Sequence, residues 1–391
     1  FISLLIYITF IYIYIFLIKY YSINQMKNYL EFERDIKDLE EELEKLKDPF
    51  NKEGISEIDT ENISRIEKEI DQKLKKSYEN LNEWQKTQVA RHEDRPKAKF
   101  FIENLFENFI NLSGDRNFSE DEAILAGFAT FNKKSVLVLG QEKGDDLESR
   151  LKRNFGMMRP EGYRKCIRLM KLANKFNIPV VTFIDTPGAY PGIGAEQRGQ
   201  AESISKSIEC CMSLKVPIIS IIIGEGGSGG AIALASANKV LMLENAIYSV
   251  ISPEGCASIL WRDPNKSLEA AKAMKLTSGE LLKMGIIDEI IKEPTGGAHR
   301  NKEEIIFSVK NAINNYLNYF KDFSRDQIYE QRKEKFLNIG KQKSFKVFSG
   351  ETTDMFKAAN FSTLVKKITS SKKNKVIIAL LFLLAIGYIL I

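Results

Sequence analysis

The sequence feature that most constrains the fold is the run GEGGSGG at residues 224–230, in which five of seven residues are glycine. The apolar run VPIISIII at 216–223 precedes it and predicts a buried strand, and AIALA at 231–235 follows it and predicts a helix. A glycine-rich strand-to-helix turn leaves bare backbone N–H groups that a substrate oxygen can approach closely. Such a turn can hold a phosphate or an oxyanion formed during a reaction, and tight packing without a ligand is the alternative.

Two phosphate-binding motifs fit this turn poorly. A P-loop needs a lysine after its last glycine, and no lysine follows Gly230. A dinucleotide fingerprint is satisfied loosely, with Glu244 as the acidic residue downstream, but the strand comes late in the chain and this short motif is a weak signal. The turn is therefore either an oxyanion site or a purely structural connection between strand and helix.

A second turn of the same kind lies at residues 183–196, with the sequence FIDTPGAYPGIGAE. A strand ends at Asp185, and a segment rich in proline and glycine then opens a helix. The DTPG motif also occurs in GTPases, but no P-loop precedes it here. Two glycine-containing turns at strand ends predict two neighbouring loops that face one pocket.

The rest of the chain predicts an α/β domain preceded by a helical hairpin, because apolar residues at helical spacing give way to alternating strands and helices. The expected helices are 26–48, about 63–81, 98–112, 163–176, 201–214 and a late region at 302–338. The expected strands are 123–131 and 135–140, which form a hairpin, and 178–184, 239–243 and 246–251.

Composition limits the chemistry. A net charge of +5 gives little support for nucleic acid as a partner. Two histidines are too few for a histidine metal site, and the four cysteines form no CxxC pair, so we expect buried free thiols and no metal on this chain. A basic run is either a solvated face or a contact for an anionic substrate such as a phosphorylated pantetheine carrier; its candidates are Arg150, Lys152, Arg153 and Arg164.

Both ends of the chain are apolar. Residues 1–18 carry no charge, and residues 376–391 follow Lys372, Lys373 and Lys375. Each end predicts a membrane or targeting segment, although Met26 opens a charged helix and residues 1–25 are equally explained as translated upstream sequence. The expected division is an extension at 1–25, a helical region at 26–97, the main domain at 98–340, a polar linker at 341–375 and the apolar segment 376–391.

Several long motifs together resemble the carboxyltransferase alpha subunit of bacterial and plastid multisubunit acetyl-CoA carboxylase. They are 154–157, 160–165, 183–196, 224–231, 248–261 and the GGAHR motif at 296–300. The resemblance runs from Met26 to about Gly340. It implies a crotonase-like α/β fold, a spiral of ββα units with backbone N–H oxyanion holes at helix starts.

The resemblance also implies an activity. The family transfers the carboxyl group of carboxybiotin, held on a separate biotin carboxyl carrier protein, to acetyl-CoA, giving malonyl-CoA for fatty acid biosynthesis. Developing negative charge on the ureido and thioester oxygens demands fixed donors, and the biotin nitrogen freed by CO2 loss can take the methyl proton. The implied oxyanion hole is Gly229, Gly230 and Ala231, with Gly226 and Gly227 shaping it. The implied pocket lining is Pro187, Gly188, Ala189, Tyr190, Pro191 and Gly192.

The implied partners are a beta subunit with a zinc ribbon, in an α2β2 assembly, the carrier protein, and biotin carboxylase, which alone uses ATP. The implied location is the cytoplasm or plastid stroma, with membrane association through the apolar ends. Two alternatives remain. Another crotonase-type acyl-CoA enzyme, a hydratase or decarboxylase, should carry paired acids, for which Glu196 and Glu254 are the candidates. An inactive membrane-anchored scaffold would have no need of the glycine segment.

Overall fold

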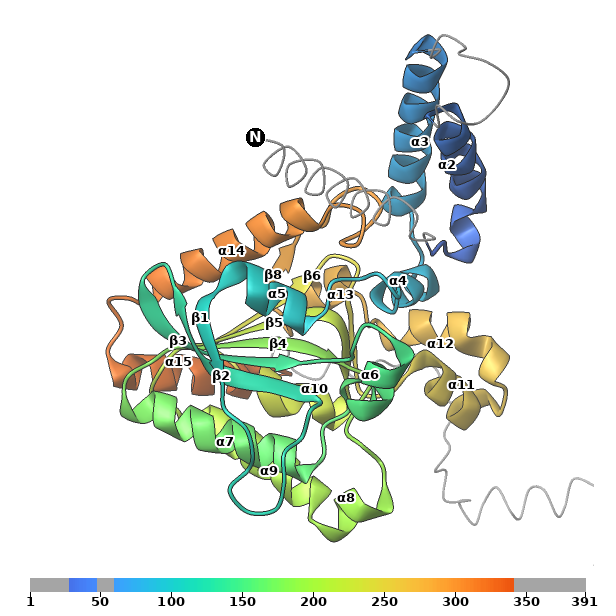
Figure 1. Cartoon of the computed structure of the whole chain (residues 1–391). Coiled ribbons are helices and arrows are strands. Elements are labelled where there is room, and N and C mark those ends of the chain that lie inside the picture. Colours follow the sequence, from blue (N-terminus) through green and yellow to red (C-terminus); the bar gives the residue numbers. More distant parts are fainter. Residues whose placement is uncertain (1–27, 48–59, 341–391) are drawn as a thin grey trace, which may run out of the picture. The chain divides into compact units, whose positions relative to one another are not determined.

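The computed structural model describes residues 28–47 and 60–340, which all lie in the first of the chain's two units, Phe1–Gly340 (Figure 1). The predicted extension at 1–25, the linker at 341–375 and the apolar segment 376–391 lie outside the described residues. In the part of the chain that is described, no helix combines the length and apolar character needed to span a membrane.

The described domain is built on one mixed sheet with the strand order β1-β2-β3-β4-β5-β6-β8, and β7 pairs with β5 (Figure 1). Strand β2 is antiparallel to both of its neighbours, β1 and β3, and the pairs from β3 to β8 are parallel. Strands β4 and β5 are buried along their whole length, as expected of parallel strands covered on both faces. The strands are β1 (Glu107–Asn111), β2 (Ile124–Phe131), β3 (Lys134–Gln141), β4 (Val180–Thr186), β5 (Ile218–Gly227), β6 (Lys239–Leu243), β7 (Ile247–Ser249) and β8 (Glu289–Ile291).

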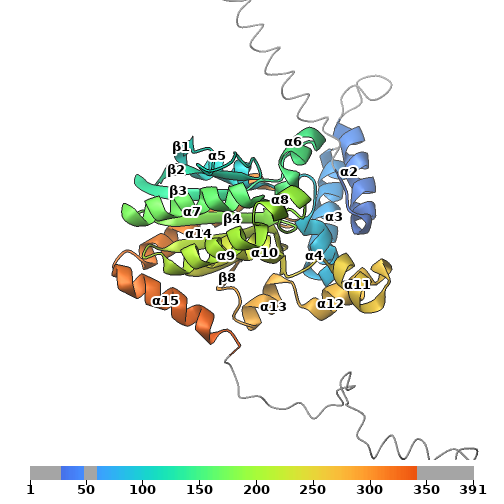
Figure 2. The same ribbon diagram turned by 90° about the horizontal axis from the view of Figure 1, so that it is seen from below.

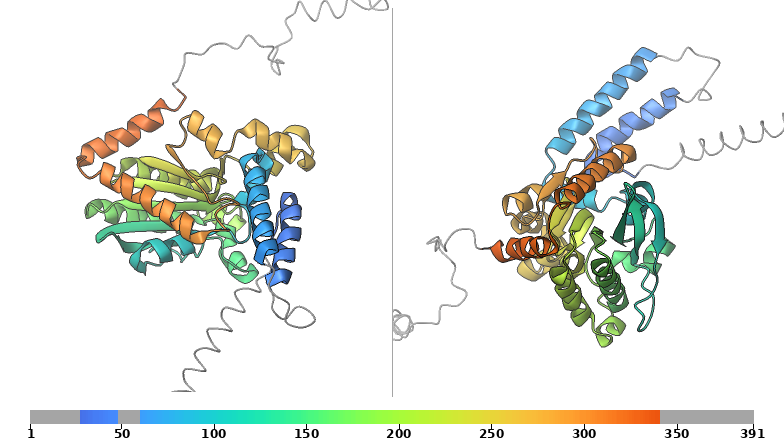
Figure 3. Two further views of the ribbon diagram at one scale, coloured as in Figure 1. Left: turned by 90° about the horizontal axis from the view of Figure 1, so that it is seen from above. Right: turned by 90° about the vertical axis from the view of Figure 1, so that its left-hand side faces the viewer.

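Helices cover both faces of this sheet. Helices α7 (Pro160–Lys175), α9 (Gln200–Ser213) and α10 (Ser228–Ala235) lie on one face (Figure 2), and α5 (Ala98–Leu105) and α14 (Lys302–Tyr319) lie on the other (Figure 3, left). The mixed α/β class predicted from the sequence is therefore confirmed. The shorter elements are α6 (Leu147–Lys152), η2 (Asn154–Gly156), α8 (Ile193–Gln197), α11 (Pro253–Trp261), η3 (Pro264–Lys266), α12 (Ser267–Met274) and α13 (Ser278–Lys283).

The last described helix, α15 (Arg325–Asn338), is tied to the domain by a buried guanidinium. Arg332 donates hydrogen bonds to the carbonyl oxygens of Cys211, Leu214 and Val216, at distances of 2.7, 2.8 and 3.1 Å. These carbonyls lie at the end of α9 and just before β5, so one side chain satisfies a helix terminus and anchors α15.

The predicted N-terminal helical hairpin is present. After η1 (Glu31–Glu33), helices α2 (Arg34–Lys47) and α3 (Thr60–Glu79) pack through Ile36, Ile66, Ile70 and Leu74 (Figure 3, right). Helix α4 (Glu83–Ala90) follows and begins at the capping residue Asn82, whose side chain accepts the N–H of Gln85.

Two sequence predictions differ from the structure. The helix predicted at 98–112 ends at Leu105, and residues 107–111 form β1 instead, because pairing with β2 at the sheet edge outweighs the local helical pattern. The late helical region at 302–338 is interrupted between α14 and α15, where Ser324 caps the second helix. Strand β8 and helices α11 to α13 are further elements of the described residues.

Candidate functional site

The glycine segment 224–230 is the junction between β5 and α10 rather than a free loop. Its first four residues continue β5 to Gly227, and its last three are the first turn of α10. Ser228 has a φ of +50°, so the strand turns into the helix at a single left-handed residue. The N–H groups of Ser228, Gly229 and Gly230 have no carbonyl one helical turn back, whereas Ala231 is the first residue whose N–H does.

The pairing of β4 with β5 shifts just before this junction. Ile184 lies opposite Ile222, but Thr186 lies opposite Gly226, so β5 advances four residues while β4 advances two. Beyond the shift, β5 also pairs with β7, where Gly227 faces Ser249. The bulge redirects the end of β5 away from the main ladder.

The second predicted turn packs directly against the glycine segment. A Cβ on Gly227 would lie 2.2 Å from the carbonyl oxygen of Pro187, and one on Gly230 would lie 2.6 Å from the carbonyl carbon and oxygen of Gly188. Side chains at these two positions would collide with backbone, which explains why glycine is required there. The two loops are thus neighbours, as the sequence predicts.

The remaining residues of the second turn lead away from this contact toward α8. The guanidinium of Arg159 lies 4.8 Å from the centre of the Tyr190 ring, and Gly192 packs against the edge of the same ring. Pro191 is exposed and Ala189 is partly buried. Of the six predicted lining residues, Pro187 is the one that borders the cleft described next.

A cleft of about 350 Å³ opens beside the two turns. Its wall combines cationic, acidic and apolar residues. A smaller hollow at Gly226 and Gly227 shares Arg91, Pro187 and Glu225 with it. The cleft is lined by Ala90, Arg91, His92, Glu93, Arg95, Lys97, Lys143, Arg150, Phe155, Met157, Asp185, Pro187 and Glu225.

Five charged side chains form a connected set of ion pairs beside the cleft. The ammonium of Lys143 lies 2.8 Å from Oδ1 of Asp185 and 2.7 Å from Oε2 of Glu225. Arg91 places Nε 2.6 Å from Oε1 of Glu225 and Nη1 2.5 Å from Oε1 of Glu254. Burial alone would raise the pKa of Glu225, but Lys143 and Arg91 outweigh it and lower that pKa to about 2.

Lys143 shows the same balance in reverse. Burial alone would lower the pKa of this ammonium, but Asp185 and Glu225 outweigh burial and hold the pKa above its usual value. Lys143 and Arg91 escape sequence analysis because nothing near them in the chain marks them. Asp185 and Glu225 could have been noticed, because each follows an apolar strand and the ends of parallel neighbours meet.

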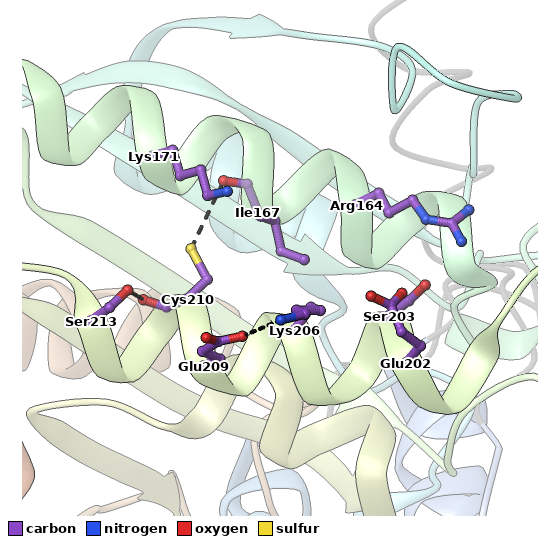
Figure 4. Close-up of a pocket in the computed structure, with 9 residues that line it drawn as sticks. All are labelled: Arg164, Ile167, Lys171, Glu202, Ser203, Lys206, Glu209, Cys210 and Ser213. Carbon is purple, nitrogen blue, oxygen red and sulfur yellow. Dashed lines mark hydrogen bonds and ion pairs between the residues drawn. The ribbon is translucent and has the colours of Figure 1, made fainter.

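The predicted basic residues do not gather at one place. Arg150 borders the cleft, and its Nη1 lies 3.4 Å from Oε1 of Glu93. Lys152 pairs with the carboxylate of Glu122 at 3.0 Å, and Arg153 donates to the Glu122 carbonyl at 2.7 Å. Arg164 lies elsewhere, in a groove of about 450 Å³ between α7 and α9 (Figure 4).

The histidines form a stacked pair. The rings of His92 and His299 lie 3.9 Å apart at 11°, and burial lowers the pKa of His299 to about 2. Nearby, Arg95 donates hydrogen bonds from Nη2 and Nη1 to the two carboxylate oxygens of Glu293, at 2.6 and 3.1 Å. Glu293 also accepts the N–H of Ala298 at 2.9 Å, so these contacts tie the GGAHR loop to the residues that follow α4.

The cysteines are free thiols: Cys166, Cys210 and Cys211 are buried and Cys256 is partly buried. Burial raises the pKa of Cys210 to about 11, which keeps the thiol protonated at neutral pH. Within residues 28–47 and 60–340, no group of three or more histidine, cysteine or acidic residues could hold a metal ion.

Comparison with known proteins identifies the family. Residues 29–340 match the family model described as acetyl co-enzyme A carboxylase carboxyltransferase-like. The chain belongs to this family. It is 64% identical over 366 residues to the acetyl-coenzyme A carboxylase carboxyl transferase subunit alpha of Pelagibacter ubique, an alignment that covers 93% of this chain and 99% of the relative. It is 53% identical over 315 residues to the subunit of the same name from Zymomonas mobilis, which covers 81% of this chain and all of the relative.

The family resemblance seen in the sequence motifs is therefore confirmed, and the chain is a carboxyltransferase alpha subunit of acetyl-CoA carboxylase. Solved structures similar to this family member include the beta subunit of Pseudomonas aeruginosa geranyl-CoA carboxylase. That likeness has a TM-score of 0.47 and 14% identity and covers 63% of this chain and 46% of that one. A Pseudomonas malonate decarboxylase hetero-tetramer gives a TM-score of 0.46 and 14% identity, covering 54% and 84% of the two chains.

Proposed function

We propose that the start of α10 is the half of the active site that receives the biotin end of the reaction, in which carboxybiotin on a carrier protein gives its carboxyl group to acetyl-CoA. The observation that carries this proposal is the first turn of α10. There Gly229 and Gly230 have N–H groups without intrahelical partners, and the segment lies against residues 187–188.

Carboxybiotin supplies the carboxyl group, and its loss leaves negative charge on the ureido oxygen. We propose that the N–H groups of Gly229 and Gly230 donate to that oxygen and stabilise the charge as it develops. Ala231 closes the first helical hydrogen bond and keeps the turn in register. Gly227 lets the backbone of the second turn approach, and Gly226 leaves room for the ring of Tyr248. Removing one such donor typically costs about 2.7–4 kcal/mol of transition-state stabilisation.

This half-site needs partners. We propose that the chain assembles with a beta subunit as α2β2, that the beta subunit binds the acetyl-CoA end, and that the carrier protein and biotin carboxylase complete the enzyme, with ATP used by the latter. We propose the cytoplasm or plastid stroma as its location. The basic residue that fits a role toward coenzyme A phosphates is Arg150, because it borders the cleft.

The test is to co-purify the full chain with its beta subunit and measure the loss of malonyl-CoA with biocytin as carboxyl acceptor. Turnover that requires both subunits and biocytin is expected. A complex that forms but shows no turnover would refute the proposal and favour a scaffold. Malonyl-CoA loss without biocytin, or hydration of crotonyl-CoA by the chain alone, would favour the other crotonase-type activities.

A further inference from the structure

Two residues at the end of β3 contact the two ends of the glycine segment, although β3 and this segment are far apart in the sequence. Gln141, the last residue of β3, donates from Nε2 to the carbonyl oxygen of Gly230 at 2.7 Å, and this contact is buried. Two residues later, the Lys143 ammonium holds the carboxylate of Glu225 at 2.7 Å. The four residues between Glu225 and Gly230 are therefore held at both ends by side chains from one short stretch of the chain.

The Glu225 end of the segment coincides with the bulge between β4 and β5. At the bulge the regular ladder is interrupted, and backbone groups must find other partners. Oδ1 of Asp185 accepts the N–H of Glu225 at 2.9 Å, so a side chain replaces the missing ladder acceptor. The Lys143 ammonium donates to the same oxygen at 2.8 Å.

Two glycines enclose this arrangement. A Cβ on Gly224 would lie 2.5 Å from Oδ1 of Asp185, and a Cβ on Gly156 would lie 2.6 Å from the Asp185 carbonyl oxygen and 3.1 Å from Cγ of Lys143. Neither position has room for a side chain, so the backbone of Gly224 packs against the Asp185 carboxylate, and that of Gly156 packs against the Asp185 carbonyl and the Lys143 stem.

Charge makes Lys143 indispensable to this arrangement. The carboxylates of Asp185 and Glu225 lie against the same ammonium, and both residues are largely buried. Without the ammonium two buried anions would face each other, and the bulge would open to separate or hydrate them. Arg91 forms an ion pair with the carboxylate of Glu225 and not with that of Asp185. It therefore cannot replace Lys143 in the contact with Asp185.

We infer that Lys143 and Gln141 are positioning residues that clamp residues 225–230 in the shape that the oxyanion site needs. The inference rests on the proposed function and deepens it. Neither residue touches the reacting atoms; each acts through the backbone donors of Gly229 and Gly230. A shift of about 1 Å in such donors lowers a rate by about 100-fold, so small relaxations of the clamp have large effects.

The test uses the full chain in complex with its beta subunit. We expect Lys143→Met and Gln141→Leu each to lower kcat for malonyl-CoA decarboxylation with biocytin at least ten-fold. The KM for malonyl-CoA should change less than two-fold, because the donors act in the transition state. Gln141→Leu loses one hydrogen bond to a carbonyl and keeps the side-chain size, so it remains informative if Lys143→Met folds poorly.

The matched control is Lys335→Met. Lys335 is a similarly buried ammonium bonded to Asp288, which also accepts the N–H of Val240 at the opposite end of the parallel strands. The Lys335→Met variant should keep kcat within two-fold of the value for the unmodified complex. A second readout is amide hydrogen exchange of residues 225–230 in the full chain, which we expect to accelerate at least ten-fold in Lys143→Met and not in Lys335→Met.

Normal kcat in both clamp variants, unchanged exchange, or an equal loss in Lys335→Met would overturn the inference. If the unmodified complex shows no turnover that depends on biocytin, the proposed function fails by itself. The exchange measurement then decides the clamp separately, because it needs no substrate and no partner subunit.

Discussion

Replacing Gly230 by alanine tests the close approach of the two turns. The new Cβ would lie 2.6 Å from the carbonyl carbon and oxygen of Gly188 and 2.9 Å from the N atom of Ala189. All three atoms belong to the backbone, so no side chain can rotate away. Restoring ordinary contact moves one turn by about 0.8 Å, and a shift of about 1 Å in a catalytic geometry costs about 100-fold in rate.

Stability should fall as well. Overpacking a buried position costs about 1–3 kcal/mol, of which alanine's helix preference recovers about 1 kcal/mol. Gly229→Ala is the matched control, because its Cβ would meet only methyl carbons of Ile204, at 3.5 Å. Gly229→Ala should therefore raise the free energy of unfolding by about 0.5–1 kcal/mol.

The assay is malonyl-CoA decarboxylation with biocytin by the complex with the beta subunit, together with urea unfolding of each variant. We expect Gly230→Ala to assemble and to lose about 100-fold in kcat. Full activity and unchanged stability in Gly230→Ala would refute the argument from close approach. A larger stability loss in Gly229→Ala than in Gly230→Ala would refute it as well.

Three further measurements test other parts of the site. Ser228→Gly should raise the free energy of unfolding by about 1 kcal/mol, because glycine relieves the left-handed φ at this position. Lys275→Gly at the end of α12, where φ is 52°, should have the same effect for the same reason. Equal or lower stability of these variants in thermal melts would contradict this reasoning. The pKa of His299 is about 2 in the folded chain and ordinarily 6.5, so the unfolded state binds more protons below pH 6.5 and stability is lost as pH falls. Urea unfolding at pH 7 and pH 5.5 should show a loss of about 1.2 kcal/mol that His299→Phe removes, and an identical loss in the variant would disprove the assignment. Glu293→Gln leaves the Arg95 guanidinium buried without its anion and should cost about 3–5 kcal/mol in the same assay; a cost below about 1 kcal/mol would contradict the buried pair.

Local patterns were sufficient to predict the frame of the molecule. Apolar residues at helical spacing in each of two segments, among them Ile36, Ile66 and Ile70, predicted the hairpin, and the continuous apolar runs before Asp185 and residue 224 predicted strands. These signals depend on spacing along one segment, which the sequence displays directly. The neighbouring position of the two glycine-containing turns could be predicted because each turn follows the end of a strand.

What sequence could not show depends on strand pairing. Residues 107–111 have no strong strand pattern, and they become β1 only because β2 offers an edge. Lys143 looks like one lysine in a polar stretch until β3 is placed beside β4. Arg91 ends a helix 134 residues before Glu225, and only the folded domain brings the two together.

The clamp on the glycine segment has a consequence for the order of folding. Its contacts join residues that are 82 and 89 positions apart, and Arg91 adds a span of 134. Closing such long loops is slow, so the segment gains its shape after the strands have paired and not from its own sequence. Mutations at Lys143 or Gln141 should consequently accelerate unfolding while leaving the refolding rate nearly unchanged. In this chain the geometry of the proposed oxyanion site therefore forms only after the surrounding strands have paired.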